Sequence, residues 1–221
     1  MHIARAAVAA AILALPTELS AQRVRVEHGN VIYQPARGAQ RVVTRGGKDS
    51  AAVLSPDGRR AAVVRYTGRT VETAQGPDAA TELWLVDVAS GAGRRLVLSA
   101  DSHSPERSLA RFSDPAFSPD GRKVYFLSNT AWVTSGAVHV VDVATGRERY
   151  LMPGNSLAVV PRGGYRGDLM VGQHRYFLAE GSYDWVWLMT PQGRQIGPIG
   201  ETDEQMEEFR RTFIDRHESK H

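Results

Sequence analysis

The residues that could perform catalysis are spread along this chain and do not form a known catalytic motif. No serine lies in a Gly-x-Ser-x-Gly turn, and the sequence contains no cysteine. The two common nucleophile patterns of hydrolases are therefore missing. The segment 181–184, Gly-Ser-Tyr-Asp, contains a serine near an aspartate, but it resembles a loop that enters a strand. The sequence predicts a protein that is not an enzyme.

Metal and cofactor sites have little support in the sequence. Asp101, His103 and Glu106 share one segment, but no His-Glu-x-x-His or comparable ligand spacing accompanies them, so a solvated polar loop is the favoured interpretation. Gly46-Gly47 and Gly163-Gly164 are turn signals that precede no predicted helix, unlike phosphate-binding loops. We expect no cofactor and no bound metal.

Aromatic and basic side chains are concentrated between residues 165 and 187. Tyr, Trp and Arg contribute much of the binding energy at protein interfaces. Trp185 and Trp187 alternate along a predicted strand and are therefore expected to face the core. The candidate partner-binding residues are Tyr165, His174, Arg175, Tyr176 and Tyr183.

An internal repeat must position these side chains. The segment 54–60, Leu-Ser-Pro-Asp-Gly-Arg-Arg, returns at 117–123 as Phe-Ser-Pro-Asp-Gly-Arg-Lys. A second motif follows each copy, because 83–91 matches 138–146 in the same order. Each repeat predicts about four antiparallel strands, which is one propeller blade.

The first motif of each repeat predicts a hairpin turn. Proline presets φ at the first central position, aspartate accepts local backbone hydrogen bonds, and glycine tolerates a positive φ. This role explains both aspartates without a metal. The turn residues are Pro56, Asp57, Gly58, Pro119, Asp120 and Gly121.

The paired Ser-Pro-Asp-Gly and Asp-Val-Ala-Ser/Thr-Gly turns resemble the WD40-like (PD40) repeats of TolB-type β-propellers. The resemblance is clear over residues 49–152; a degenerate blade follows at 156–199, and strands at 23–27, 31–34 and 40–44 form a partial blade. It implies an all-β, propeller-like stack of three to four antiparallel blades over 22–200, either a small ring or an open arc. Polar segments 67–80 and 98–113 are predicted as long loops that form a binding rim or are mobile.

The two ends of the chain differ from the repeats. Residues 1–21 resemble a signal peptide with cleavage after Ala21, because the apolar run of roughly 10 residues is shorter than the about 20 that span a bilayer. Segment 201–221 predicts an amphipathic helix from Thr202 to about His217, with a Thr202–Gln205 capping box. We expect its stripe of Met206, Phe209 and Phe213 to pack on the last blade and to cover an exposed edge.

These features together predict a function in binding. The net charge of +3 is scattered, which disfavours nucleic acid. The resemblance to TolB-type propellers implies a periplasmic or secreted scaffold for a protein or peptide of the bacterial envelope, without a transmembrane segment in the mature chain and with a dimer through exposed blade edges as one option. The alternatives are an immunity or inhibitor protein, a carbohydrate or small-ligand binder that exposes Trp185 or Trp187, and an accessory fragment of a propeller-containing hydrolase.

Overall fold

The computed structural model describes residues 22–129 and 131–215 of the 221-residue chain. The described part is all-β apart from short helical segments, and its strands form four antiparallel sheets in chain order. The predicted signal peptide, residues 1–21, and the last part of the predicted C-terminal helix lie outside the described residues.

Each sheet is built from consecutive strands. The first sheet contains β1 (Arg23–Glu27), β2 (Asn30–Gln34) and β3 (Arg41–Val42). The second contains β4 (Asp49–Leu54), β5 (Arg60–Thr73), β6 (Gly76–Asp87) and β7 (Gly93–Leu98). The third contains β8 (Phe112–Phe117), β9 (Lys123–Ser128), β10 (Ala137–Asp142) and β11 (Glu148–Pro153). The fourth contains β12 (Ser156–Val159), β13 (Leu169–Tyr176), β14 (Ser182–Met189) and β15 (Gln195–Gly200).

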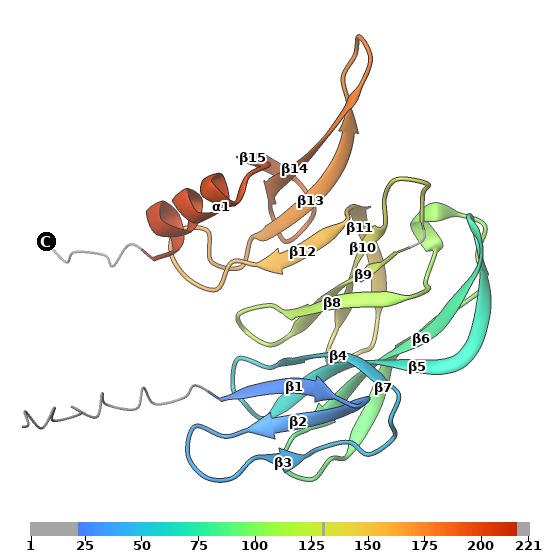
Figure 1. The fold of residues 1–221 in the computed structure, drawn as a ribbon, viewed down its shortest axis with the longest axis vertical. Coiled ribbons are helices and arrows are strands. Elements are labelled where there is room, and N and C mark those ends of the chain that lie inside the picture. Colours follow the sequence, from blue (N-terminus) through green and yellow to red (C-terminus); the bar gives the residue numbers. More distant parts are fainter. Residues whose placement is uncertain (1–21, 130, 216–221) are drawn as a thin grey trace, which may run out of the picture.

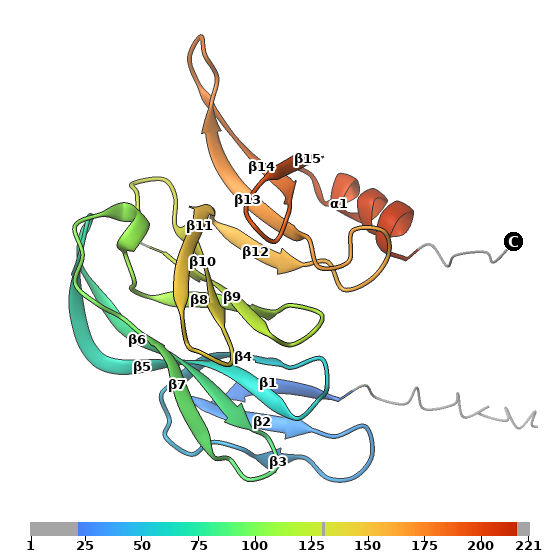
Figure 2. The ribbon, with the colours of Figure 1, turned by 180° about the vertical axis from the view of Figure 1, so that it is seen from behind.

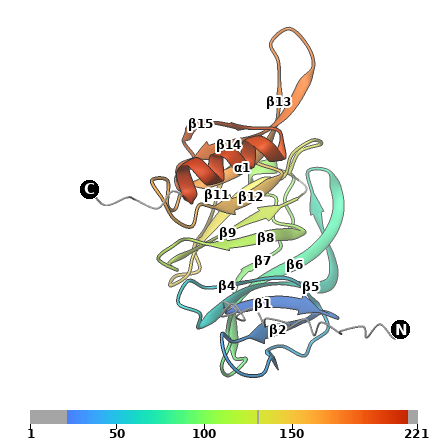
Figure 3. The ribbon, with the colours of Figure 1, turned by 60° about the vertical axis from the view of Figure 1, so that its left-hand side comes forward.

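The sheets are stacked like the blades of a propeller that has been opened (Figure 1, Figure 2). The first strands of successive sheets, β1, β4, β8 and β12, contact one another in that order. The first and fourth sheets lie at opposite ends of the stack (Figure 3). The described residues therefore form an open arc, which confirms the all-β propeller-like prediction in its arc form.

A separate apolar cluster fills each space between neighbouring sheets, as stacked blades require. Val31 packs with Val63 between the first two sheets, and Leu83 belongs with Phe126 to the cluster between the second and third. Tyr125 and Trp187 belong to the cluster between the third and fourth sheets. These clusters show that the blade faces, and not only the hairpins, hold the stack together.

The predicted Ser-Pro-Asp-Gly turns have the expected geometry. The Ser55 hydroxyl donates to Asp57 Oδ1 at 2.5 Å, and the Arg59 N–H donates to the same oxygen at 3.1 Å. The second copy repeats this arrangement at Asp120. Gly58 and Gly121 have φ of 70° and 69°, a conformation that favours glycine at both positions. Local hydrogen bonds within the turns therefore account for both aspartates.

The C-terminal segment covers a face of the fourth sheet. Helix α1 (Asp203–Phe209) begins at Thr202 with the predicted capping box and continues into a π-helical turn, η2 (Arg210–Ile214). Phe209 and Ile214 pack on Val160 and Leu188. The predicted contact with the last blade is therefore present. The expectation that the helix covers a strand edge is wrong, because its apolar side chains pack on a face of the sheet.

The prediction of a loop over residues 67–80 is also wrong. This segment extends the β5–β6 hairpin, in which Thr70 to Thr73 pair with Ala79 to Gly76. Its polar composition misled the prediction because the buried side chains of the hairpin extension include the polar Thr73 and Asp78. The extension therefore lacks the apolar alternation of a half-buried strand. The second predicted loop, 98–113, has its two ends in β7 and β8. Between them it is irregular except for a short 3-10 helix, η1 (Pro105–Arg107), and an isolated bridge between Ala100 and Leu109.

Candidate functional site

The hairpin formed by β13 and β14 is flanked by other strands only at its base. β12 pairs with Leu169–Gly172, and β15 pairs with Val186–Met189. The outer half, Gln173–Tyr176 and Ser182–Trp185, pairs only with itself and projects beyond the sheet (Figure 1). We call this outer half, together with its connecting turn 177–181, the projecting hairpin.

The tip of the projecting hairpin is apolar and exposed. Tyr176 is 66% exposed, Phe177 is 57% exposed, and Leu178 is fully exposed. The Phe177 N–H donates to the Gly181 carbonyl at 3.0 Å and closes the turn. A turn usually carries polar residues, so the exposed apolar run at this position makes the tip a candidate interaction surface.

A neighbouring loop adds a pocket beside the hairpin. Residues 131–135 lie next to β13, where the Thr134 hydroxyl is 3.4 Å from the Tyr176 hydroxyl. The pocket between them has a volume of about 380 Å³. Its lining is mostly apolar and consists of Trp132, Val133, Thr134, Ser135, Pro153, His174 and Tyr176. Val133 is 87% exposed at its rim, so the apolar surface continues from the tip onto this loop.

One face of the projecting hairpin carries a row of aromatic rings. Tyr183 lies 4.7 Å from Phe177 and 5.3 Å from Trp185, measured between ring centroids. Trp185 is 6.1 Å from Trp187, over which the Arg175 guanidinium lies at 3.7 Å. The row joins the exposed tip to the core between the third and fourth sheets, and it stiffens the hairpin.

The other face of the hairpin is polar. His174 Nδ1 lies 3.0 Å from Asp184 Oδ1 across the two strands, and the His174 ring contacts the Tyr176 ring at 5.0 Å. The side chain of Asp184 is 73% exposed. The hairpin therefore has one aromatic face and one polar face.

The structure brings four of the five predicted binding residues together on this hairpin. His174, Tyr176 and Tyr183 border its exposed surfaces, whereas Arg175 is held against Trp187. Tyr165 lies apart from them, in the cluster under the C-terminal helix, and its ring contacts Phe209 and Phe213.

Sequence reasoning missed the most exposed residues of the site. Phe177, Leu178 and Val133 were not among the candidates, although all three are exposed. The available signal was the run Tyr176-Phe177-Leu178 directly before a glycine-containing turn. Three consecutive large apolar residues in an exposed turn are unusual in a soluble domain unless they are functional.

A second pair of titratable groups, also missed, lies inside the stack. His139 Nδ1 is 2.5 Å from Glu148 Oε1, and the His139 ring stacks on Phe126. His139 is only 1% exposed, so it is closed to a substrate and we assign the pair to packing. In the described ranges, no group of three or more His, Asp or Glu side chains is placed to hold a metal ion. Within the same ranges, no helix is long and apolar enough to cross a membrane.

The fold is similar to those of several solved propeller proteins. TolB from Acinetobacter baumannii matches 82% of this chain with a TM-score of 0.55 and 16% identity, over 40% of its own length. The tricorn protease matches 82% of the chain with a TM-score of 0.53 and 12% identity, over 16% of its length. The β-propeller domain of the Trilobed protease from Pyrococcus furiosus, which has an open velcro topology, matches 78% with a TM-score of 0.52 and 12% identity, over 49% of its length.

These similarities define the class of fold. The chain has a TolB-like β-propeller fold and spans less than half the length of each of these structures. No protein-family model matches the sequence, and no curated protein sequence matches it. Because the sequence identities are this low, the similarities establish the fold alone, and the function has to be inferred from the site.

Proposed function

We propose that this chain is a non-catalytic binding module of the bacterial envelope that recognises a protein partner through the tip of the projecting hairpin and the adjoining pocket. The observation that carries this proposal is the continuous exposure of Tyr176, Phe177 and Leu178 at the end of a strand pair. Exposed apolar residues held on a rigid element lose little conformational entropy on binding, so more of their burial free energy contributes to affinity.

The alternative of a carbohydrate binder with a tryptophan platform is not favoured by the geometry. A stacking platform needs an open indole face. Trp187 is 7% exposed and is covered by Arg175. Trp185 is partly buried, and its Nε1 donates to Glu201 at 3.2 Å.

The experiment is an affinity capture of envelope proteins with the tagged full-length chain. Phe177→Asp/Leu178→Asp tests the tip, and Val42→Asp/Leu98→Asp is the matched control, because Val42 and Leu98 are exposed apolar residues of other sheets. We expect a partner that binds the wild type and the control and is lost by the tip variant. A partner that the tip variant retains equally, or no reproducible partner, would refute the proposal.

The envelope location is tested separately. The predicted signal peptide requires that the exported protein begin at Gln22. Expression of the full-length chain in a bacterial host, followed by intact-mass measurement of the periplasmic fraction, should show loss of the first 21 residues. An uncleaved protein confined to the cytoplasm would contradict the envelope assignment and leave the binding proposal intact.

A further inference from the structure

The projecting hairpin leaves backbone hydrogen-bonding groups of β14 without a neighbouring strand. In an antiparallel pair, residues alternate between exchanging hydrogen bonds with their partner strand and directing their N–H and C=O groups away from it. The bond from Phe177 N–H to the Gly181 carbonyl sets this alternation. It follows from the register that Ser182 and Asp184 direct their N–H and C=O groups away from β13.

Strand β15 would occupy this edge if it continued, but it stops short. Its last pair with β14 is Gly200 opposite Val186, and the chain then turns into helix α1. The edge of Ser182–Trp185 therefore lies in line with β15 and beyond its end. Ser182 and Asp184 are both exposed at this edge.

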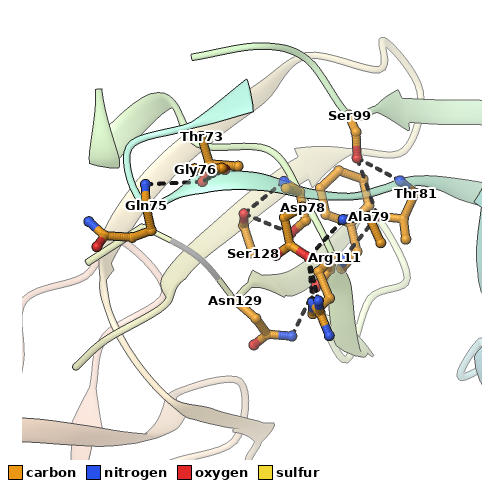
Figure 4. A network of polar contacts seen from close by, with 12 residues as sticks. Thr73, Gln75, Gly76, Asp78, Ala79, Thr81, Ser99, Arg111, Ser128 and Asn129 are labelled. Atoms are coloured by element: carbon orange, nitrogen blue, oxygen red, sulfur yellow. Dashed lines mark hydrogen bonds and ion pairs between the residues drawn. The ribbon is translucent and has the colours of Figure 1, made fainter. Parts of the chain in front are cut away.

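The other long hairpin of the molecule shows how the chain covers such an edge. Beyond β4 and β7, the β5–β6 hairpin is bordered by the segment 99–111 (Figure 4). Ser99 N–H donates to the Thr81 carbonyl at 2.9 Å, and Arg111 N–H donates to the Ala79 carbonyl at 3.0 Å. Arg111 also pairs with the buried side chain of Asp78 at 2.5 Å. No segment among the described residues forms such backbone hydrogen bonds with the β14 edge at Ser182–Trp185. Free edges are normally blocked because they recruit other strands.

We infer that an extended segment of a partner protein adds as a strand to the free edge of β14 along Ser182–Trp185, in line with β15. This inference rests on the proposed function and specifies its mode of binding. Strand addition takes its affinity from main-chain hydrogen bonds and its specificity from alternate side chains. The two faces of the hairpin define those side chains.

The aromatic face selects apolar residues. Tyr183 and Trp185 lie on this face and are partly buried, so a Val or Ile opposite them buries apolar area. The polar face selects basic residues, because Asp184 projects from it. Glu180 at the tip and Glu201 after the end of β15 add acidic charge at the two limits of the edge. The partner segment therefore alternates β-branched residues with lysine or arginine.

A second copy of this chain fits the edge less well. A symmetric antiparallel pairing centred on this segment places the two Asp184 carboxylates on the same face at neighbouring positions. Like charges at such positions are destabilising. The acidic edge thus favours a basic partner over self-association.

The test uses a synthetic hexapeptide, acetyl-Lys-Val-Lys-Val-Lys-Val-amide, with the full-length chain. Amide hydrogen exchange followed by NMR should slow at Ser182 and Asp184 when the peptide is added, because their N–H groups become paired. A version of the peptide N-methylated at alternate residues lacks the matching donors and should give no protection. Asp184→Lys should weaken binding about tenfold or more. The control Glu208→Lys, which changes an exposed residue of α1, should bind like the wild type.

The strand-addition proposal is wrong if the peptide leaves both amides unprotected, or if the N-methylated peptide protects them equally. Equal binding by Asp184→Lys would overturn the charge assignment on which the choice of partner depends. These failures are distinct from failure of the proposed function. A captured partner could depend on Phe177 and Leu178 while the hexapeptide leaves the Ser182 and Asp184 amides unprotected. That result would support recognition through the tip and would refute strand addition.

Discussion

The guanidinium of Arg175 lies over the indole ring of Trp187, with its Cζ 3.7 Å from the ring centroid. Two of its nitrogens also donate to Gln173 Oε1, at 3.0 and 2.5 Å, and Gln173 in turn donates to the Pro153 carbonyl at 2.6 Å. Arg175 therefore holds Gln173 in place, and the Gln173 amide joins the projecting hairpin to the third sheet. The guanidinium charge is therefore engaged by Trp187 and Gln173 of the same chain.

Replacing Arg175 should accordingly weaken folding. Arg175→Met keeps the aliphatic stem but removes the cation–π contact and the hydrogen bonds to Gln173, at an expected cost of about 1–2 kcal/mol in the free energy of unfolding. Urea denaturation measures this loss. Arg69→Met is the control, because Arg69 is exposed on the other long hairpin. An equal, near-zero effect for both variants would show that Arg175 is not structural.

Replacing each of two leucines of the fourth blade by alanine should change the free energy of unfolding by very different amounts. Leu178 is fully exposed at the tip, whereas Leu188 is 4% exposed and packs with Phe209. Leu178→Ala should change the free energy of unfolding by less than about 0.5 kcal/mol. Leu188→Ala should cost about 3 kcal/mol because it leaves a cavity under the helix. Thermal or urea unfolding of both variants checks this, and a comparable loss for Leu178→Ala would mean that the tip packs within the fold.

The repeats could be predicted from sequence because their signals are local. Pro119, Asp120 and Gly121 fix a turn by φ and by short-range hydrogen bonds, and strand β9 follows this turn directly. The β13–β14 hairpin was harder to predict. The extent of its projecting half depends on where β12 and β15 stop, which is a matter of tertiary contacts and not of local propensity.

The position of Tyr165 illustrates the same limit. The loop that carries it suggested an exposed binding residue, but Phe209 and Phe213 of the C-terminal segment pack on its ring. A contact between residues more than forty positions apart leaves no periodic signal in the sequence. The amphipathic stripe of the helix predicted that it would pack on something, but not which side chains it would cover.

The start of the C-terminal helix gives a third prediction. The Thr202 hydroxyl accepts from the Gln205 N–H at 3.3 Å, and the Gln205 side chain accepts from the Thr202 N–H at 3.1 Å. Thr202→Ala removes the hydroxyl cap and should cost about 1 kcal/mol. Thr202→Ser keeps the cap and should stay close to wild type. Unfolding curves of the two variants separate the cap from general effects of substitution, and equal losses would contradict its role.

The two Ser-Pro-Asp-Gly turns predict how stability depends on pH. The hydrogen bond from the Ser55 hydroxyl and that from the Arg59 N–H lower the pKa of Asp57, and Ser118 and Arg122 lower the pKa of Asp120 in the same way. A carboxyl group whose native pKa lies below its unfolded value of about 3.9 stabilises the fold above that value. The contribution is lost as pH falls through the depressed native pKa.

The variant Asp57→Asn/Asp120→Asn should therefore be less stable than the wild type at neutral pH, with a difference that shrinks as the pH falls below about 4. Both carboxylates are largely solvated, so screening keeps the loss modest. Urea unfolding at neutral and acidic pH measures the two differences, and NMR titration of the Asp57 and Asp120 carboxyl groups locates their pKa values directly. A stability difference that stays constant with pH would show that the turns depend on side-chain shape, and that the ionised carboxylates add nothing to them.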